Sequence, residues 1–288
     1  MNCVRLFRFS HSSGPRLGIE LDGKLYDATT LVPDVLTSLA SWLAHDRPLL
    51  VLHLAAERAK NALALAPGVT LLAPVDTQEV WASGVTYERS KVARMEESEG
   101  GGDFYDKVYD AERPELFFKS VAWRVVPPGG SVRIRKDSTW DVPEPEMTLV
   151  IAKNGQIVGV TVGNDMSSRS IEGENPLYLP QAKTYDGACA LAPFIRVLDD
   201  DLDLRNLPIS VKISRAGKVE FAGNTNTSTM KRTPEELVGF LFRETAFPDG
   251  ALLMTGTGVV PPDGFTLQSG DTIEIEIPGV ATLVNTVD

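Results

Sequence analysis

Two glutamates and one aspartate provide the clearest chemical signal in the sequence. Glu144 and Glu146 lie two residues apart in the stretch Trp140-Asp-Val-Pro-Glu-Pro-Glu, whose prolines disfavour a helix, so both side chains should point to one face of an extended chain. Downstream, Asn154-Gly155 is typical of a tight type I′ hairpin turn. If these two residues form the turn, Glu144 lies opposite Asp165 on the returning strand. The sequence therefore predicts that the three carboxylates converge.

Three converging carboxylates repel one another, so a cation, basic side chains or protonation must compensate the repulsion. Carboxylate oxygens suit Mg²⁺, Mn²⁺ or Ca²⁺ better than Zn²⁺. We therefore expect one divalent cation, Mg²⁺ before Mn²⁺ or Ca²⁺, on Glu144, Glu146 and Asp165. The alternative that the pattern alone leaves open is a solvated acidic edge without a metal.

Composition limits the classes of protein that this chain can belong to. The chain has 288 residues, is 43% hydrophobic, which suffices for a packed core, and carries a formal net charge of −11. Such an acidic chain lacks the basic surface that general nucleic-acid binding needs. It contains no long apolar run and no typical secretory signal, and its two scattered cysteines do not suit a disulfide framework. We expect a cytoplasmic protein with neither a nucleic-acid nor a membrane partner.

Short strands and a few helices are expected to position the acidic residues in a β-rich α+β fold. We predict a small N-terminal α+β region over residues 1–75 and a mainly β catalytic region over 76–288. The polar segment Glu96–Pro114 contains three consecutive glycines and is either a surface loop or a mobile lid. Helices are predicted at 34–44, 49–65 and 234–246, and strands at 3–8, 17–21, 24–28, 69–72, 79–82, 116–118, 131–135, 146–152, 156–162, 193–198, 208–215, 218–222, 251–254 and 272–277.

At the acidic residues the sequence resembles the fumarylacetoacetate hydrolase superfamily. The Glu-x-Glu pair of that family is matched by Glu144-Pro-Glu146, and its Asn-Asp-x-Ser-x-Arg segment by Asn164-Asp165-Met-Ser-Ser-Arg169. The resemblance runs in order over about residues 78–288 and implies that the three carboxylates hold Mg²⁺. Further similar blocks are Lys183-Thr-Tyr-Asp186 with Pro193, Thr255-Gly-Thr-Gly258, and Gly270-Asp271 before the strand at 272–277.

The resemblance also implies a fold and an assembly. Members of this superfamily have a mixed β-sandwich roll with the active site at one end, and they commonly form homodimers or homotetramers. Hydrolytic members carry a His and a Glu, three residues apart, that activate water, but Ser90 and Ala93 stand at those places here. The amino-acid sequences of segments 140–146 and 172–183 are most similar to those of the 2-keto-3-deoxy-D-arabinonate dehydratases of the superfamily, which act in sugar-acid catabolism.

That similarity implies the removal of water from a 2-keto-3-deoxy-pentonate, giving 2,5-dioxopentanoate. A metal acting as a Lewis acid would chelate the C1 carboxylate and the C2 oxo group of this 2-oxo acid and acidify its C3 protons. A base must take a C3 proton and an acid must assist loss of the C4 hydroxyl, after which an enol tautomerises to the aldehyde. Glu115 and Lys183 are the candidates for these two proton transfers, in either order.

Four more residues are candidates for contacts with the substrate, namely Thr257, Arg169, Glu172 and Asn175, with Arg169 favoured as a residue that orients Asp165. For Thr257 the competing explanation is a plain glycine-rich turn, and Arg169 could instead bind the substrate. Three other functions remain open on the same residues: a C–C hydrolase of acylpyruvates or diketo acids, a 2-oxo acid decarboxylase, and a non-catalytic sensor of sugar acids. The sequence leaves open which pentonate epimer is used.

Overall fold

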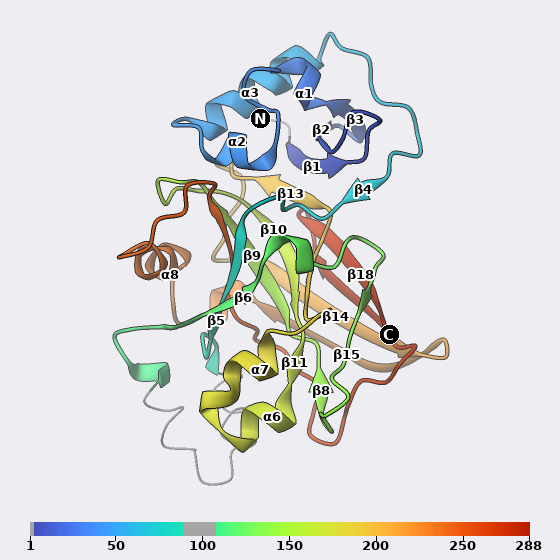
Figure 1. The fold of residues 1–288 in the computed structure, drawn as a ribbon, viewed down its shortest axis with the longest axis vertical. Helices are drawn as coiled ribbons and strands as arrows, with labels where there is room; N and C mark the ends of the chain where they lie inside the picture. The colour runs from blue at the N-terminus through green and yellow to red at the C-terminus, as the bar shows by residue number, and fades with distance from the viewer. Residues whose placement is uncertain (1–2, 89–107) are drawn as a thin grey trace.

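The computed structural model describes residues 3–88 and 108–288 of the chain. Within these residues the strands form an eleven-stranded mixed sheet, a five-stranded mixed sheet and a two-stranded ladder (Figure 1). The order of the large sheet is β3-β2-β1-β13-β10-β9-β16-β5-β6, with β12 added to β10 and β4 to β1. Its strands are β1 (Arg5–Phe9), β2 (Arg16–Leu21), β3 (Lys24–Asp27), β4 (Leu71–Leu72), β5 (Glu79–Gly84), β6 (Glu115–Ser120), β9 (Pro145–Ile151), β10 (Ile157–Asp165), β12 (Cys189–Leu191), β13 (Phe194–Val197) and β16 (Ala251–Met254).

The second sheet packs against one face of the large sheet. Leu149 of β9 and Val160 of β10 lie in a common core with Ile209 and Ile273 of the second sheet. This packing of two mixed sheets confirms the predicted β-rich α+β fold. The order of the second sheet is β15 (Lys218–Asn226), β14 (Pro208–Arg215), β17 (Thr272–Ile277), β18 (Ala281–Val287) and β7 (Ser131–Val132), and the separate ladder joins β8 (Asp141–Val142) to β11 (Ser167–Ser168).

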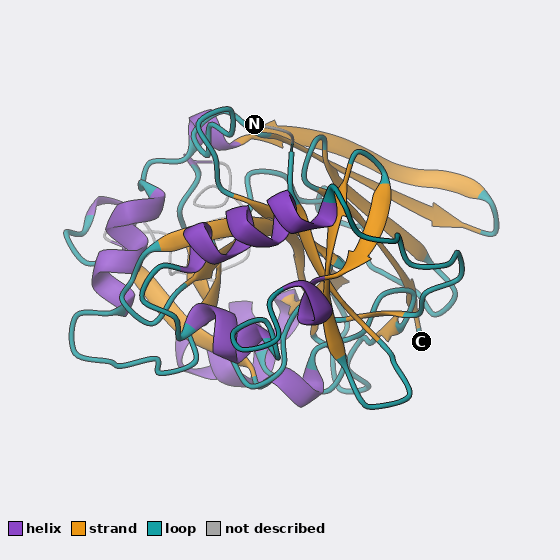
Figure 2. Cartoon of the chain, turned by 90° about the horizontal axis from the view of Figure 1, so that it is seen from above, coloured by secondary structure: helices purple, strands orange, loops and turns teal. Residues whose placement is uncertain are grey.

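The N-terminal helices cover the other face of the large sheet. Val150 of β9, which points away from Leu149, lies in a core with Trp42 and Leu52 of these helices. Figure 2 shows the helices gathered over the strands when the molecule is seen from above. Because β1 pairs with β13, the large sheet continues across residue 75, and the division into 1–75 and 76–288 stays a prediction.

Helices in the described chain are shorter than the sequence predicts. Ser38 caps the N-terminus of α2, whose first amides also bind the Asp76 carboxylate, so the helix begins at Leu39 rather than at residue 34. Helix α3 ends well before residue 65, where the chain is exposed and does not pack against the core. The helices are α1 (Ala28–Leu31), α2 (Leu39–Leu43), α3 (Pro48–Ala59), α6 (Arg169–Glu174), α7 (Leu179–Lys183) and α8 (Pro234–Leu241), with 3₁₀ turns η1 (Ala122–Arg124), η2 (Pro176–Tyr178) and η3 (Thr227–Thr229).

The β9–β10 hairpin reaches the predicted register by a different route. Asn154 does not have a positive φ, and Gly155 has a φ of 81°, so the turn is not of type I′. The amide of Ala152 donates to the Gln156 carbonyl, which makes a three-residue loop and shifts the pairing by one residue. An extra residue in β10, Val158, then shifts the pairing back. The second irregularity cancels the first.

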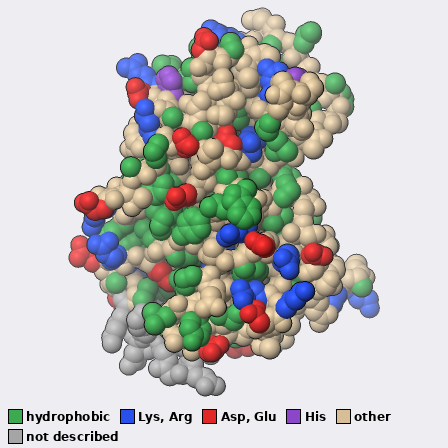
Figure 3. Space-filling model, in the orientation of Figure 1, with side chains coloured by type: hydrophobic (Ala, Val, Ile, Leu, Met, Phe, Trp, Pro, Cys, Tyr) green, Lys and Arg blue, Asp and Glu red, His purple; other side chains and the backbone are tan. Residues whose placement is uncertain are grey.

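Apolar side chains gather across the middle of one face of the molecule, with charged side chains around them (Figure 3). Large hydrophobic residues that are exposed on the described surface include Trp123, which is 76% exposed, and Leu177. The predicted homodimer or homotetramer stays a prediction. In the described part of the chain, no helix combines the length and the apolar character needed to cross a membrane.

Candidate metal centre

The three predicted carboxylates converge at the end of the β9–β10 hairpin. Glu146 pairs with Gly163, and the amide of Asp165 donates to the Glu144 carbonyl at 3.0 Å, so all three side chains share one face of the large sheet. Each residue is buried, and one ligand atom from each lies within 4.8 Å of the others. A solvated acidic edge is therefore wrong as a description of these residues.

Strand β6 brings a second set of side chains to the same face. Ala82 and Gly84 of β5 pair with Phe117 and Glu115 of β6. Ala82 lies in the same hydrophobic core as Val150, which is on the face of the sheet that carries the triad. The Glu115 carboxylate lies against Gly84, because a Cβ built on Gly84 would be 2.0 Å from Glu115 Oε2. Glu115 thus lies beside Gly84 on the face that carries the triad, and its role in proton transfer stays a prediction.

Lys183 is the basic group that joins the triad directly. It is the last residue of α7, its side chain is 1% exposed, and its ammonium donates to the Glu144 carboxylate. The same Nζ lies 3.2 Å from Asp165 Oδ2 and 2.5 Å from Ser167 Oγ. It also lies 5.8 Å from the centre of the Phe117 ring. The structure therefore places Lys183 beside the acidic site, as the sequence predicts.

Lys119 is a second buried lysine that the sequence analysis did not select. Its Nζ forms an ion pair of 2.5 Å with Asp165 Oδ1 and donates to the carbonyls of Met166, at 3.0 Å, and Lys183. The signal that could have found it is the spacing of Glu115, Phe117 and Lys119, which are two apart on a strand and share a face. Lys119 is itself the extra residue of a bulge between the pairs Val80–Ser120 and Trp81–Phe118.

Arg169 supports a different carboxylate from the one expected. Its guanidinium donates to Glu144 Oε1 at 2.5 Å rather than to Asp165, because it begins α6 and that helix follows the β8–β11 ladder. Glu172, one turn later in α6, is buried and lies 4.0 Å from the same guanidinium. Arg169 is thus placed to orient Glu144.

The electrostatics of the triad indicate a place for a cation. Burial raises the pKa of Glu146 well above its usual value, and the carboxylates of Asp165 and Glu144 raise it further. Lys183 and the hydrogen bond from the Gly256 amide, 2.6 Å from Glu146 Oε2, lower that pKa but do not offset the rise. A small divalent cation would favour the ionised form of Glu146. The buried donor set, which consists of oxygens alone, fits such an ion.

A small cavity opens onto these groups. Thr257 lines it, and its hydroxyl donates to the Val259 carbonyl at 3.0 Å. Val85, also in the wall, has a φ of 51°, which strains a β-branched residue and is typical of functional sites. The lining residues in the described chain are Ser83, Gly84, Val85, Phe117, Glu144, Glu146, Lys183, Gly256 and Thr257.

Other predicted residues lie apart from this cavity or cannot be placed. The Asn175 side chain caps η2 by accepting from the Leu177 amide at 2.9 Å, and it is not among the lining residues. Ser90 and Ala93 lie outside the described residues, as does most of the predicted lid at Glu96–Pro114. Substrate contacts by Asn175 and Glu172 stay predictions.

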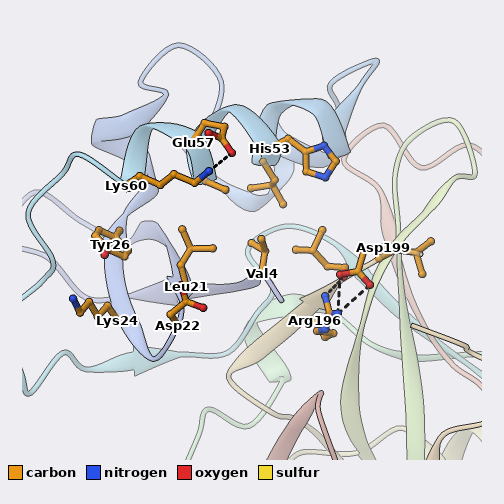
Figure 4. Close-up of a pocket in the computed structure, with 14 residues that line it drawn as sticks. Val4, Leu21, Asp22, Lys24, Tyr26, His53, Glu57, Lys60, Arg196 and Asp199 are labelled. Atoms are coloured by element: carbon orange, nitrogen blue, oxygen red, sulfur yellow. Dashed lines mark hydrogen bonds and ion pairs between the residues drawn. The ribbon is translucent and has the colours of Figure 1, made fainter. Parts of the chain in front are cut away.

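A wider cavity of about 440 Å³ lies far from this chemistry, between α3, the β2–β3 hairpin and the end of β13 (Figure 4). Four of its charged groups form two ion pairs, Lys60 with Glu57 at 2.6 Å and Arg196 with Asp199 at 2.8 Å. It contains none of the residues that the sequence selects. We assign no chemistry to it.

Known proteins resemble this chain in sequence and in structure. It is 51% identical over 214 residues, 74% of this chain and 73% of the relative, to a probable 2-keto-3-deoxyxylonate dehydratase of Haloferax volcanii. It is 43% identical over 222 residues, 76% of this chain and 74% of the relative, to the 2-dehydro-3-deoxy-D-arabinonate dehydratase of Saccharolobus solfataricus.

A solved structure of a 2-keto-3-deoxy-D-arabinonate dehydratase in complex with magnesium and 2,5-dioxopentanoate superposes with a TM-score of 0.80. The match has 32% identity and covers 99% of this chain and 98% of that one. The model of the fumarylacetoacetate (FAA) hydrolase C-terminal family matches residues 79–288, which include every residue of the candidate metal centre. This chain belongs to the fumarylacetoacetate hydrolase family.

Proposed function

We propose that this protein is a Mg²⁺-dependent dehydratase that converts a 2-keto-3-deoxy-pentonate into 2,5-dioxopentanoate. One observation carries the proposal: the buried cluster of three carboxylates and Lys183 is intact in a chain that is 51% and 43% identical to two dehydratases of such substrates. The dehydratase structure with magnesium and 2,5-dioxopentanoate has the same fold.

Glu144, Glu146 and Asp165 would hold the cation. Their oxygens form the hard donor set that Mg²⁺ prefers, and the raised pKa of Glu146 reflects carboxylate charge that a cation would balance. When bound, the cation supplies an electron sink for the C2 carbonyl group of the 2-oxo acid. Arg169 and the Gly256 amide would keep Glu144 and Glu146 oriented for this role.

The remaining chemistry is proton transfer, which the side chains of this protein must perform. Loss of one C3 proton and the C4 hydroxyl gives a C3–C4 double bond and water. A C5 proton must then leave and a proton must return to C3, which gives a C4–C5 enol that becomes the aldehyde. Lys183 and Glu115 are our candidates for the two proton carriers, because both lie on the face of the sheet that carries the cavity.

Thr257 is our candidate for holding the substrate carboxylate at the cavity wall. Its hydroxyl must first leave the Val259 carbonyl to which it now donates. Arg169 does not line the cavity and pairs with Glu144, so we assign it to the orientation of Glu144. Glu172 and Asn175 stay our candidates for contacts with the substrate hydroxyls.

Substrate stereochemistry is simpler than the two relatives' names suggest. In a 2-keto-3-deoxy-pentonate, C2 is a carbonyl carbon and C3 a methylene, so C4 is the one stereocentre left. Arabinonate and xylonate of the same D or L series share their C4 configuration and therefore give the same compound. The open choice for this protein is between the D and the L form at C4.

We also propose the setting in which the enzyme works. Its partner is a small-molecule 2-oxo acid from sugar-acid catabolism, and its location is the cytoplasm, which the scarcity of cysteine favours. We propose a homodimer or a homotetramer, supported by the exposed Trp123 and the apolar region around the middle of one face (Figure 3). Light scattering measures the molar mass of the purified protein in solution. The mass of a monomer would contradict the proposed oligomer.

The test of the function is product analysis by NMR. The purified protein is incubated with the D and the L form of 2-keto-3-deoxy-pentonate, each with Mg²⁺ and with a chelator. We expect 2,5-dioxopentanoate from one form, only when Mg²⁺ is present. Release of CO₂ instead would identify a decarboxylase, and binding without turnover would identify a sensor.

A further inference from the structure

Each metal-centre carboxylate contacts a protein donor other than Lys183 through one oxygen, and Lys183 contacts the second oxygen of Glu144 and of Asp165. Arg169 donates to Glu144 Oε1 at 2.5 Å, and the Gly256 amide donates to Glu146 Oε2 at 2.6 Å. Lys119 Nζ lies 2.5 Å from Asp165 Oδ1. The three donors come from different elements, α6, the loop after β16, and β6.

Lys119 is held in place more tightly than an ordinary ion-pair partner. Its side chain is fully buried, and its ammonium also donates to the carbonyls of Met166 and Lys183. The first carbonyl follows Asp165 directly, and the second belongs to the C-terminal residue of α7. The ammonium therefore has two backbone acceptors in fixed positions beside its ion pair with Asp165 Oδ1, and it can leave that oxygen only by breaking contacts with both of them.

This arrangement limits how Asp165 can bind a cation. With Oδ1 on Lys119, the carboxylate offers Oδ2, the oxygen that faces Lys183 at 3.2 Å. One-oxygen binding suits Mg²⁺, which takes six ligands in a strict octahedron and keeps several waters. Ca²⁺ takes six to eight oxygens and often binds carboxylates through both of them.

We propose that Lys119 is a positioning residue that restricts Asp165 to one-oxygen binding and thereby makes the site prefer Mg²⁺ or Mn²⁺ over Ca²⁺. The inference rests on the proposed function only in taking Glu144, Glu146 and Asp165 as the metal ligands. It makes no assumption about the substrate or the reaction. Lys119 acts through Asp165 and does not itself touch the cation.

The experiment is calorimetric titration of the metal-free protein with Mg²⁺ and with Ca²⁺, without substrate, in the wild type and in Lys119→Met. We expect the ratio of the two dissociation constants to shift in favour of Ca²⁺ by about tenfold or more in the variant, because Asp165 Oδ1 becomes available. The control is Lys183→Met, which removes the same charge from the same cluster but contacts Oδ2. This control variant should bind both cations more tightly without changing the ratio of their dissociation constants.

Two results would overturn the proposal. One is an equal shift of the ratio in Lys119→Met and Lys183→Met, because the effect would then be charge alone. The other comes from the wild type and does not depend on a variant that folds: a crystal structure with Mn²⁺ in which Asp165 binds through both oxygens. A Lys119→Gln variant, whose amide can still donate to Oδ1, should keep the wild-type ratio. Absence of dehydratase activity would reject the proposed function and leave these metal measurements unaffected.

Discussion

Lys183 Nζ lies 3.2 Å from Asp165 Oδ2, so the last residue of α7 meets the last residue of β10 inside the buried cluster. The same ammonium contacts the Glu144 carboxylate and the Ser167 hydroxyl. It lines the cavity together with Glu144 and Glu146. Lys183 is thus placed both to balance the carboxylates and to reach a ligand in the cavity.

The first prediction concerns turnover without Lys183. Lys183→Ala should keep Mg²⁺ binding, because the three carboxylates remain, and should lose about 10²–10⁴-fold in kcat, the usual loss when a proton-transfer group is removed. Steady-state kinetics and calorimetry measure the two effects. Lys212→Ala, which removes a lysine from an exposed pair with Glu274, is the matched control and should behave as wild type. Full activity in Lys183→Ala would remove this lysine from the mechanism.

The second prediction concerns the metal ligands. Glu146→Gln has the same shape but lacks the charge, so Mg²⁺ affinity should fall by about 100-fold or more, with activity falling in parallel. Calorimetry of the metal-free protein measures the affinity. Glu274→Gln, a surface change of the same kind, should leave it unchanged. An unaltered Mg²⁺ affinity in Glu146→Gln would mean that the cation binds elsewhere.

A third prediction uses the contact between Gly84 and Glu115. A methyl group at Gly84 would overlap Glu115 Oε2, so Gly84→Ala should displace that carboxylate and lower kcat by about 100-fold if Glu115 carries a proton. In a Glu115→Ala background the same methyl group meets no carboxylate, and Gly84→Ala should have little further effect. Additive losses in the double variant would show that Gly84 acts independently of Glu115.

The fourth prediction concerns the two thiols. Burial raises the pKa of Cys189 to about 12, whereas Cys3 is exposed. A thiol reagent at pH 8 should therefore modify one cysteine quickly and the second only after unfolding, and Cys3→Ser should remove the fast phase. Two fast thiols in the folded wild type would contradict the burial of Cys189.

The same pKa predicts a direction for stability at high pH. The folded state keeps the Cys189 thiol protonated up to about pH 12, whereas an unfolded thiol ionises near pH 8.5. The unfolded state therefore binds fewer protons between these values, and this group lowers the free energy of unfolding as pH rises, by up to about 1.4 kcal/mol per unit. Denaturant titrations of wild type and Cys189→Ala at pH 8 and 10 measure the difference. Equal pH dependence in both would contradict it.

Local sequence patterns predicted the strands and the triad well. The register of β9 and β10 placed Glu146 and Asp165 on one face as expected, although the turn and the bulge at Val158 that produce it were not foreseen. Two shifts that cancel leave no trace in the spacing of the ligands. The prediction of the triad was therefore confirmed in its geometry, while the turn type was wrong.

What the sequence could not show depends on contacts between distant segments. Strand β18 was missed because the buried Asn285 interrupts its apolar alternation, and its amide donates to the Gly130 carbonyl at 3.2 Å. Lys119 was missed because a lysine in a strand is usually exposed, and its acceptors on β10 and α7 are brought to it only by the fold. Arg169 was favoured as a residue that orients Asp165, whereas its guanidinium donates to Glu144.

The most direct test of the central claim compares two classes of substrate under the same Mg²⁺ conditions. One is the D or L form of 2-keto-3-deoxy-pentonate, and the other is an acylpyruvate that a hydrolase would cleave into two acids. Because the resemblance places Ser90 and Ala93 where hydrolytic members carry the water-activating His and Glu, we expect hydrolysis to be weaker by about 10²–10⁴-fold, while the pentonate yields 2,5-dioxopentanoate. Efficient release of two acids from the acylpyruvate, with no 2,5-dioxopentanoate from either form of the pentonate, would contradict the account.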